Sequence, residues 1–198
     1  MELLIVRHAA AEEGSALRSD ARRELTARGR QRMELAVRGL RSLPLRCEVL
    51  WHSPWTRAAQ TAELLAPLVA GPRVACSALA RAPDESLLAD LARQARDARR
   101  RVRDHGPEEL RGVEAAVAPA RAGSLRVADG TRIALVGHEP WLTELVAWLT
   151  LADRAAGSGL RLGKGGVAWL QGRPEPGGME LRALLPPRVL RQLGRARR

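Results

Sequence analysis

An arginine and a histidine stand side by side where the first apolar segment of the chain ends, as Arg7 and His8. They follow residues 3–6, a short apolar run that predicts a buried strand of a parallel sheet. In open α/β sheets, ligands bind in the crevice beyond the carboxyl ends of the strands. There a planar guanidinium can hold two phosphate oxygens while an imidazole attacks phosphorus. The pair therefore points to phosphate chemistry.

A second arginine follows the strand predicted over residues 48–51. Arg57 lies in the segment SPWTRAAQTA, within the first turn of a helix predicted over residues 55–65. Free backbone N–H groups and the positive end of the helix dipole favour anions at this position. The alternative is a solvated surface arginine in an arginine-rich chain.

A third motif, VGHEP, follows the strand predicted over residues 133–136. His138 stands between this strand and a helix predicted over residues 141–151, and Gly137 would allow a ligand to approach the backbone closely. His138 could equally be a residue that caps the helix. Because all three strand ends carry side chains suited to phosphate, we expect them to form one pocket.

Together the RH pair, SPWTRAAQTA and VGHEP resemble the histidine phosphatase superfamily. The opening RHA and residues 22–29 are similar to its SixA-type phosphohistidine phosphatase branch, and the likeness covers residues 1 to about 92 and 131 to about 170. This resemblance implies that His8 is the nucleophile that becomes transiently phosphorylated. It also implies that the phosphate is bound by Arg7, Arg57 and His138.

The implied chemistry needs no metal and no other cofactor. Two arginines and a protonated histidine can stabilise the charge on the equatorial phosphoryl oxygens, and no carboxylate-rich metal motif is present in the sequence. His8 must attack as a neutral imidazole whose other nitrogen is held by an acceptor. Lysine should not replace Arg7 or Arg57, because the bidentate geometry would be lost.

Larger relatives use a carboxylate to protonate the leaving group. Asp84 and Glu85 lie roughly where such an acid could come from, but the pair is also typical of a helix cap and first turn. An alcohol leaves poorly without a general acid, whereas imidazole, with a pKa of about 6.5, leaves readily. A site without a dedicated acid therefore favours phosphohistidine on a protein, and small phosphate esters are the alternative substrates.

The composition sets limits on the class of protein. With 198 residues, of which 45% are hydrophobic, the chain is expected to form a single domain over residues 1–198. No apolar run approaches the roughly 20 residues that span a bilayer, so we expect a cytoplasmic protein without membrane contact. The sequence does not predict an oligomeric state.

The net charge of +11 has two explanations. Lys164 is the only lysine, and Phe and Tyr are absent, which indicates a compositional bias that inflates arginine. The charge would still attract anions, so a non-catalytic phosphate- or polyanion-binding module is a further hypothesis. Nucleic acid is disfavoured as a partner, because no nucleic-acid-binding motif or aromatic stacking platform is present.

Apolar strand patterns alternate with helical ones along the chain. This order predicts a three-layer α/β/α sandwich with a mostly parallel central sheet, as in histidine phosphatases. Thr26 is the predicted N-cap of the first helix, and a later helix is predicted over residues 87–102, ending near Gly106-Pro107. Further segments are a possible strand at 74–79, a short helix at 108–117, and strands at 166–170 and 179–184.

Two arginine-rich parts have no predicted role in the pocket. The stretch over residues 94–129 could be a lid, a docking surface for an acidic phosphoprotein or a solvated helical excursion, and we favour the last. The basic tail from residue 186 is expected to be frayed or to form a short helix.

Overall fold

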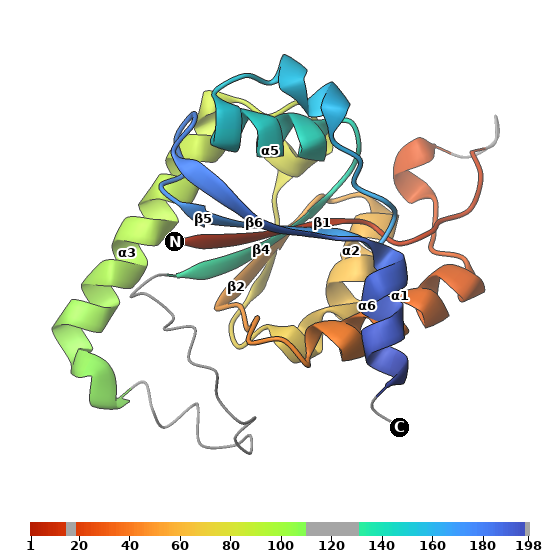
Figure 1. The fold of residues 1–198 in the computed structure, drawn as a ribbon, viewed down its shortest axis with the longest axis horizontal. Coiled ribbons are helices and arrows are strands. Elements are labelled where there is room, and N and C mark those ends of the chain that lie inside the picture. Colours follow the sequence, from red (N-terminus) through yellow and green to blue (C-terminus); the bar gives the residue numbers. More distant parts are fainter. Residues whose placement is uncertain (15–18, 110–130, 197–198) are drawn as a thin grey trace.

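A six-stranded sheet lies at the centre of the computed structural model, which describes residues 1–14, 19–109 and 131–196 (Figure 1). The strands are β1 (Glu2–Arg7), β2 (Val49–His52), β3 (Arg73–Ala75), β4 (Arg132–Gly137), β5 (Val167–Gly172) and β6 (Met179–Leu185). Their order across the sheet is β3-β2-β4-β1-β5-β6. The first four strands are parallel, whereas β5 runs antiparallel to β1 and to β6. The predicted mostly parallel sheet is confirmed.

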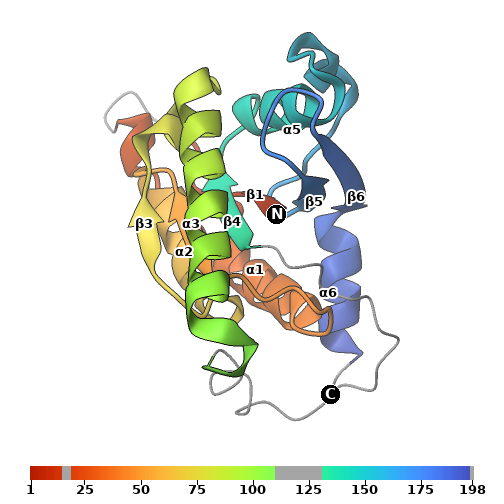
Figure 2. The same ribbon diagram turned by 90° about the vertical axis from the view of Figure 1, so that its left-hand side faces the viewer.

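Helices cover both faces of the sheet, which is therefore the middle of three layers (Figures 1 and 2). One face carries α1 (Ala27–Leu40), α2 (Thr56–Leu64) and α6 (Pro187–Arg195). The other carries α3 (Glu85–Glu109) and α5 (Trp141–Leu151). Short 3-10 helices are η1 (Asp20–Arg22), η2 (Ala66–Leu68), η3 (Ser77–Ala80) and η4 (Ala155–Gly159). The predicted α/β/α sandwich is confirmed.

The apolar run of β1 supplies both cores. Successive side chains of a strand point to opposite faces of the sheet. Leu3 and Ile5 accordingly pack in the core beneath α3 and α5. Leu4 and Val6 pack in the core beneath α1, α2 and α6. This double burial explains why the segment is continuously apolar rather than alternating.

Helix boundaries agree with the sequence prediction at some points and differ at others. Thr26 caps α1, and its Oγ1 accepts a hydrogen bond from the Gly29 N–H at 2.9 Å. Helix α3 continues past Gly106-Pro107, where an end was predicted, to Glu109. Only β3, a three-residue strand, and η3 lie in the segment predicted as a possible strand over residues 74–79. The remainder of the arginine-rich stretch, residues 110–129, lies outside the described residues, as does most of the helix predicted over 108–117.

The basic tail forms an ordered helix in the described part of the chain. Helix α6 packs along α1, and its Leu190 is fully buried in the core that α1 and α2 share. The burial of this leucine anchors a helix that is otherwise polar and basic. Among the described helices, none is long and apolar enough to cross a membrane.

The carboxyl ends of β1, β4 and β2 meet at one edge of the sheet. Arg7, the last residue of β1, is in register with Gly137, the last residue of β4. The hydrogen-bond ladder then extends one residue further, because the His8 N–H donates to the Gly137 carbonyl at 3.1 Å. The Ser53 N–H likewise donates to the Val136 carbonyl at 2.9 Å. The three strand-end motifs are therefore neighbours in space.

Candidate active site

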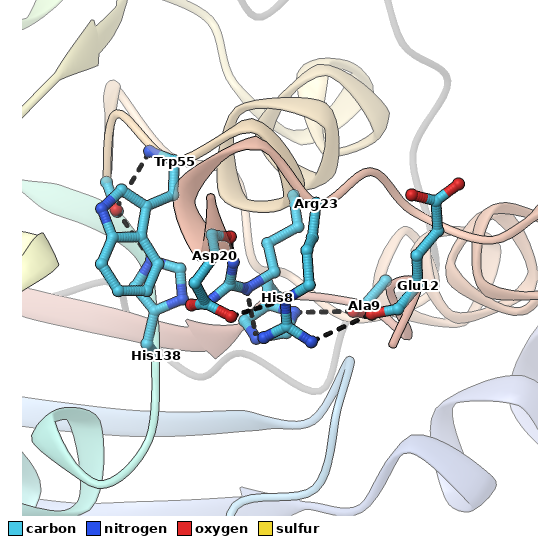
Figure 3. Close-up of polar contacts among 9 residues, drawn as sticks. His8, Ala9, Glu12, Asp20, Arg23, Trp55 and His138 are labelled. Atoms are coloured by element: carbon cyan, nitrogen blue, oxygen red, sulfur yellow. Dashed lines mark hydrogen bonds and ion pairs between the residues drawn. The ribbon is translucent and has the colours of Figure 1, made fainter. Parts of the chain in front are cut away.

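A pocket of about 340 Å³ opens at these strand ends. Its lining side chains are Arg7, His8, Asp20, Arg23, Trp55, Arg57, His138, Glu139, Trp141 and Lys164. Cationic side chains outnumber the two carboxylates, so the pocket is suited to an anion. Figure 3 shows Asp20, Arg23 and His138 gathered around His8, with the Trp55 ring beside His138, while the side chain of Glu12 extends away.

His8 is held as a neutral imidazole. Only 6% of the residue is exposed, and burial lowers its pKa to about 3, with the positive charges of Arg57 and Arg7 adding to this effect. Its Nδ1 lies 2.7 Å from the Ala9 carbonyl oxygen. A carbonyl can only accept, so Nδ1 carries the proton and Nε2 carries the lone pair. This is the tautomer that a nucleophilic Nε2 requires.

Arg57 reaches back from the first turn of α2 to His8. Its Nε–H donates to Nε2 of His8 at 3.2 Å, and its two terminal nitrogens donate to the Asp20 backbone carbonyl at 2.6 Å and carboxylate at 2.9 Å. The guanidinium also lies 4.6 Å from the centre of the Trp55 ring. Only 3% of Arg57 is exposed. The alternative of a solvated surface arginine does not describe this residue.

Thr61 is a positioning residue that sequence reasoning missed. Its hydroxyl donates to the Arg57 carbonyl at 2.7 Å and accepts from the Ala9 N–H at 3.1 Å. This fully buried threonine thereby ties the backbone after His8 to the first turn of α2. Thr61 follows Arg57 by about one helical turn, so the two residues lie on the same face of the helix. This spacing could have identified Thr61 from the sequence.

His138 lies beside the nucleophile, with 5.1 Å between the centres of the His8 and His138 rings. Its Nε2 is 2.8 Å from the Ser53 hydroxyl, while Nδ1 is buried and has no partner among the described residues. Burial and then the charge of Arg57 lower its pKa to about 4. The protonated histidine expected from the sequence is thus neutral here at pH 7, because burial and then the charge of Arg57 disfavour its protonated form.

Arg7 approaches the same space from the end of β1. One terminal nitrogen donates to the Leu162 carbonyl at 2.9 Å, which fixes the guanidinium. Its Nε is buried without a hydrogen-bond partner among the described residues. Such an unpaired donor is costly unless a ligand satisfies it. The structure therefore brings together the four predicted site residues: Arg7, His8, Arg57 and His138.

The two predicted acids lie elsewhere. Asp84 caps α3, since its Oδ1 accepts from the Leu87 N–H at 3.1 Å and from the Ser86 hydroxyl at 2.6 Å. These hydrogen bonds lower the pKa of Asp84 to about 2, which makes it a poor proton donor. Glu85 is the first residue of α3, and neither residue lines the pocket. A carboxylate that caps a helix and one that acts as a general acid cannot be distinguished in the sequence. The structure places Asp84 and Glu85 at the start of α3.

Glu139 is the carboxyl group that lines the pocket with a raised pKa. Burial raises its pKa, although the Thr143 hydroxyl donates to its Oε2 at 2.6 Å. Its Oε1 is buried without a partner among the described residues. A carboxyl whose pKa is raised beside a phosphate site can act as a proton donor.

Gly137 serves packing rather than ligand approach. A Cβ at this position would lie 3.0 Å from a methyl group of Leu142 and 3.3 Å from the Leu79 carbonyl oxygen. The backbone conformation of Gly137 is one that other residues adopt, since its φ is not positive. The sequence predicted that this glycine makes room for a ligand. In the structure the space beside it is filled by α5 and η3.

The fold and the pocket define an α/β protein with a neutral histidine set among anion-binding side chains at the ends of parallel strands. The chain belongs to the histidine phosphatase superfamily (branch 1), whose sequence profile matches residues 3–184. Membership of this superfamily, expected from the motifs, is confirmed. In the described part of the chain, no group of three His, Cys, Asp or Glu residues is placed to hold a metal ion.

Solved structures with the same fold act on different phosphates. The fold is similar to that of the protein histidine phosphatase SixA solved with tungstate, with a TM-score of 0.67 and 20% identity over 96% of this chain and 99% of that one. It is also similar to a phosphoserine phosphatase of Entamoeba histolytica solved with 3-phosphoglyceric acid, with a TM-score of 0.56 and 15% identity over 96% and 98% of the two chains. At these identities the likeness shows the fold.

A curated relative matches a shorter part of the sequence. An uncharacterized protein of Picosynechococcus sp. is 40% identical over 72 residues, which are 36% of this chain and 44% of that protein. The match thus spans less than half the length of this relative.

The Asp20 carboxylate is paired with guanidinium groups that a phosphate would need for binding. It pairs with Arg57 at 2.9 Å and with Arg23 at 2.6 Å. Burial acts to raise its pKa, but the hydrogen bonds and charges of the two arginines prevail and lower it. The carboxylate is therefore ionised at neutral pH, and an incoming phosphate dianion competes with it for the same guanidinium groups.

We expect Asp20→Asn to bind inorganic phosphate about two- to fivefold more tightly than wild type, the range for loss of a half-exposed ion pair. Titration calorimetry with inorganic phosphate measures this without relying on turnover. Asp84→Asn is the matched control, because that aspartate lies outside the pocket, and it should leave phosphate affinity unchanged. Weaker binding by Asp20→Asn would mean that Asp20 orients Arg57 rather than competing with the ligand.

Proposed function

We propose that the protein is a metal-independent phosphatase that works through a phosphohistidine intermediate on His8. The observation that carries this proposal is the tautomer of His8, whose Nδ1–H is donated to Ala9 and whose Nε2 lone pair faces Arg57 in an anion-suited pocket. A nucleophile of this kind splits phosphate hydrolysis into two easier displacements. Membership of the histidine phosphatase superfamily supports the assignment.

In the first displacement, Nε2 of His8 forms a bond to phosphorus while the bond from phosphorus to the leaving group breaks. The leaving group takes the electron pair of that bond and then a proton. In the second displacement, water attacks the phosphoryl group, the P–N bond to His8 breaks, and inorganic phosphate and neutral His8 result. Arg7, Arg57 and His138 surround the pocket and can stabilise the charge on the three equatorial oxygens in both steps.

The substrate that we propose is phosphohistidine on a protein. Its imidazole leaving group, with an unperturbed pKa of about 6.5, departs without the strong acid that an alkoxide needs. The similarity of fold to the protein histidine phosphatase SixA agrees with this choice. A phosphorylated protein is accordingly the proposed partner, and a cytoplasmic location remains a prediction.

Small phosphate esters are the second candidate substrates, because Glu139 offers a proton donor. Burial raises its pKa, and its Oε1 has no hydrogen-bond partner among the described residues. The similarity of fold to a phosphoserine phosphatase agrees with ester hydrolysis. Hydrolysis of esters would require the Glu139 carboxyl as a proton donor, whereas hydrolysis of phosphohistidine would not.

Phosphate release in the presence of EDTA tests the proposal. A phosphohistidine peptide and a panel of phosphate esters would be compared at equal concentration. Turnover of the phosphohistidine peptide with a clear preference over the esters is the expected result. Preferential ester turnover would replace the substrate class, loss of activity in EDTA would remove metal independence, and no turnover of any substrate would favour a non-catalytic phosphate-binding module.

We expect Glu139→Gln to lower kcat for esters by about 10²- to 10⁴-fold, the usual contribution of a general acid, and to change kcat for a phosphohistidine peptide little. Because the protonated carboxyl is the active form, ester turnover in wild type should fall as the pH rises through the raised pKa of Glu139. Steady-state kinetics on both substrates, with their pH profiles, measure these effects. Glu63→Gln, a change at an exposed position of α2 outside this pocket, is the matched control. Equal losses on both substrates would show that Glu139 has a role other than protonating the leaving group.

A further inference from the structure

Four arginines are grouped on the surface formed by α1 and α6. They are Arg32, Arg188, Arg191 and Arg195. Arg191 is partly buried and the other three are exposed. Arg188, Arg191 and Arg195 are three and four residues apart on α6, so they lie on one face of that helix. Burial and then the positive charges of Arg32, Arg195 and Arg188 lower the pKa of Arg191, which agrees with this grouping. In the described part of the chain, none of the four forms an ion pair with a carboxylate. We call this group the arginine face.

Close contact between two helices makes the arginine face rigid. A Cβ on Gly39 of α1 would lie 2.0 Å from the Leu190 carbonyl oxygen, and a Cβ on Gly194 of α6 would lie 2.0 Å from the Leu35 carbonyl oxygen. Only glycine permits such an approach of two helix backbones. Figures 1 and 2 both show α6 packed against α1, with the two helices crossing at an angle. The arginines therefore project from a fixed platform and not from a loose tail.

The platform is joined to the rim of the pocket. Pro187, at the start of α6, packs against Gly163 and Gly166, on either side of a turn that carries the pocket residue Lys164. The same turn is fixed to the nucleophile strand, because the Gly165 N–H donates to the Arg7 carbonyl at 3.0 Å. The start of α6 therefore lies beside the rim of the pocket, where a protein whose phosphorylated side chain enters the pocket can contact it.

Positive charges that are grouped without counterions repel one another, which costs free energy. A negatively charged ligand that binds there removes this cost. The pocket already contains the cations that a phosphate requires, so a small phosphorylated molecule would gain nothing from arginines outside it. A protein that carries carboxylates beside its phosphorylated residue would bind more tightly, because the carboxylates could pair with these arginines. Helices α1 and α6 contain no aromatic residue, so they offer no platform for stacking nucleobases.

We propose that the arginine face of Arg32, Arg188, Arg191 and Arg195 is the docking surface for an acidic segment of the phosphoprotein substrate. This inference rests on the proposed function and names the chemistry of the substrate beyond its phosphoryl group. It also assigns the docking role to α1 and α6, where the sequence had suggested the stretch over residues 94–129 as one candidate.

Two peptides test the proposal. Both contain one phosphohistidine, and one carries an oligoglutamate flank where the other carries an equal run of glutamines. We expect wild type at low ionic strength to show a KM about tenfold lower for the glutamate peptide, with similar kcat, as several partly exposed charge pairs would give. The difference should shrink as salt is added.

The combined variant Arg32→Gln, Arg188→Gln and Arg191→Gln should lose this preference and keep its kcat/KM on the glutamine peptide. The matched control replaces Arg73, Arg93 and Arg100 by glutamine, which removes the same charge from exposed positions on β3 and α3. The control should retain most of the preference. A preference that survives in the first variant, or falls equally in both, overturns the proposal.

Binding of the unphosphorylated peptides, followed by fluorescence anisotropy, separates this proposal from the proposed function. If no peptide is turned over but the glutamate peptide still binds through the three arginines, the proposed function fails and the docking surface stands. Equal binding of both peptides overturns the docking surface. Tighter binding of a single-stranded oligonucleotide than of the glutamate peptide at the same face would replace the acidic protein by a nucleic acid.

Discussion

Replacing His8 by alanine is expected to reduce phosphate release by roughly 10⁴-fold or more, as removal of a catalytic nucleophile does elsewhere. The neutral imidazole lines the pocket with Nε2 beside Arg57, and its Nδ1–H is held by the Ala9 carbonyl. The other histidine of the described pocket, His138, has its Nε2 engaged with the Ser53 hydroxyl, so it does not present that nitrogen to a substrate. Phosphate release from a phosphohistidine peptide measures the loss.

The covalent intermediate gives a second measurement of the same prediction. Wild type mixed with substrate and denatured in alkali should carry one phosphoryl group, detected by intact mass, and peptide mapping should locate it on His8. His8→Ala should carry none. Phosphorylation of another residue, or turnover by His8→Ala at more than a small fraction of the wild-type rate, would exclude His8 as the nucleophile.

His52 provides a matched control for this experiment. It also ends a parallel strand, and its Nδ1 lies 2.9 Å from the carbonyl of the next residue, Ser53. Unlike His8, it does not line the pocket. His52→Ala should therefore retain turnover, which would show that position in the pocket, rather than the local histidine geometry, makes the nucleophile.

The parts of the fold that could be predicted are those whose local pattern has one structural meaning. The run at residues 3–6 is apolar at every position, and burial on both faces of a parallel sheet requires that. Thr26 followed by a helical pattern predicted the cap that is observed. Because strand ends of a parallel sheet share one edge, the spacing of three motifs along the chain was sufficient to place their side chains together.

The missed residues of the site depend on contacts between distant segments. Asp20 lies in a polar segment with no periodicity, and its pairing with Arg57 joins residues 37 positions apart. Glu139 was visible beside His138, but its raised pKa comes from burial that no local pattern reports. Asp84 was considered as an acid because a carboxylate at a helix start has the same sequence signature in either role.

The helix pairing that forms the arginine face was hidden for a similar reason. The tail from residue 186 is rich in arginine and contains little apolar periodicity, which is typical of a solvated end. What holds α6 in place is the buried Leu190 together with Gly39 and Gly194, which allow the backbones of α1 and α6 to touch. Glycine inside a helix normally lowers helix propensity, so neither residue indicates from sequence alone that two helices pack there.

Arg57→Lys is expected to lower both kcat and kcat/KM by about 10²- to 10³-fold, the usual cost of one lost donor at the developing charge. Lysine keeps the charge but offers a single nitrogen in place of a planar fork. Arg57 uses all three of its nitrogens at once, with Nε on His8 and the other two on Asp20. A lysine ammonium cannot hydrogen-bond the imidazole and two phosphate oxygens at once. Because an ammonium is more strongly hydrated than a guanidinium, it also loses more solvation free energy at a position that is only 3% exposed.

Arg23→Lys separates this geometric requirement from charge alone. Arg23 also lines the pocket and pairs with Asp20, but its remaining hydrogen bond goes to the Glu12 carbonyl and not to His8. A single charged nitrogen can serve that role, so turnover should change less than about tenfold, in line with a partly exposed ion pair. Steady-state kinetics on a phosphohistidine peptide would compare the two variants at equal pH and salt. If Arg57→Lys were as active as Arg23→Lys, charge rather than the forked geometry of the guanidinium would be what the pocket requires of residue 57.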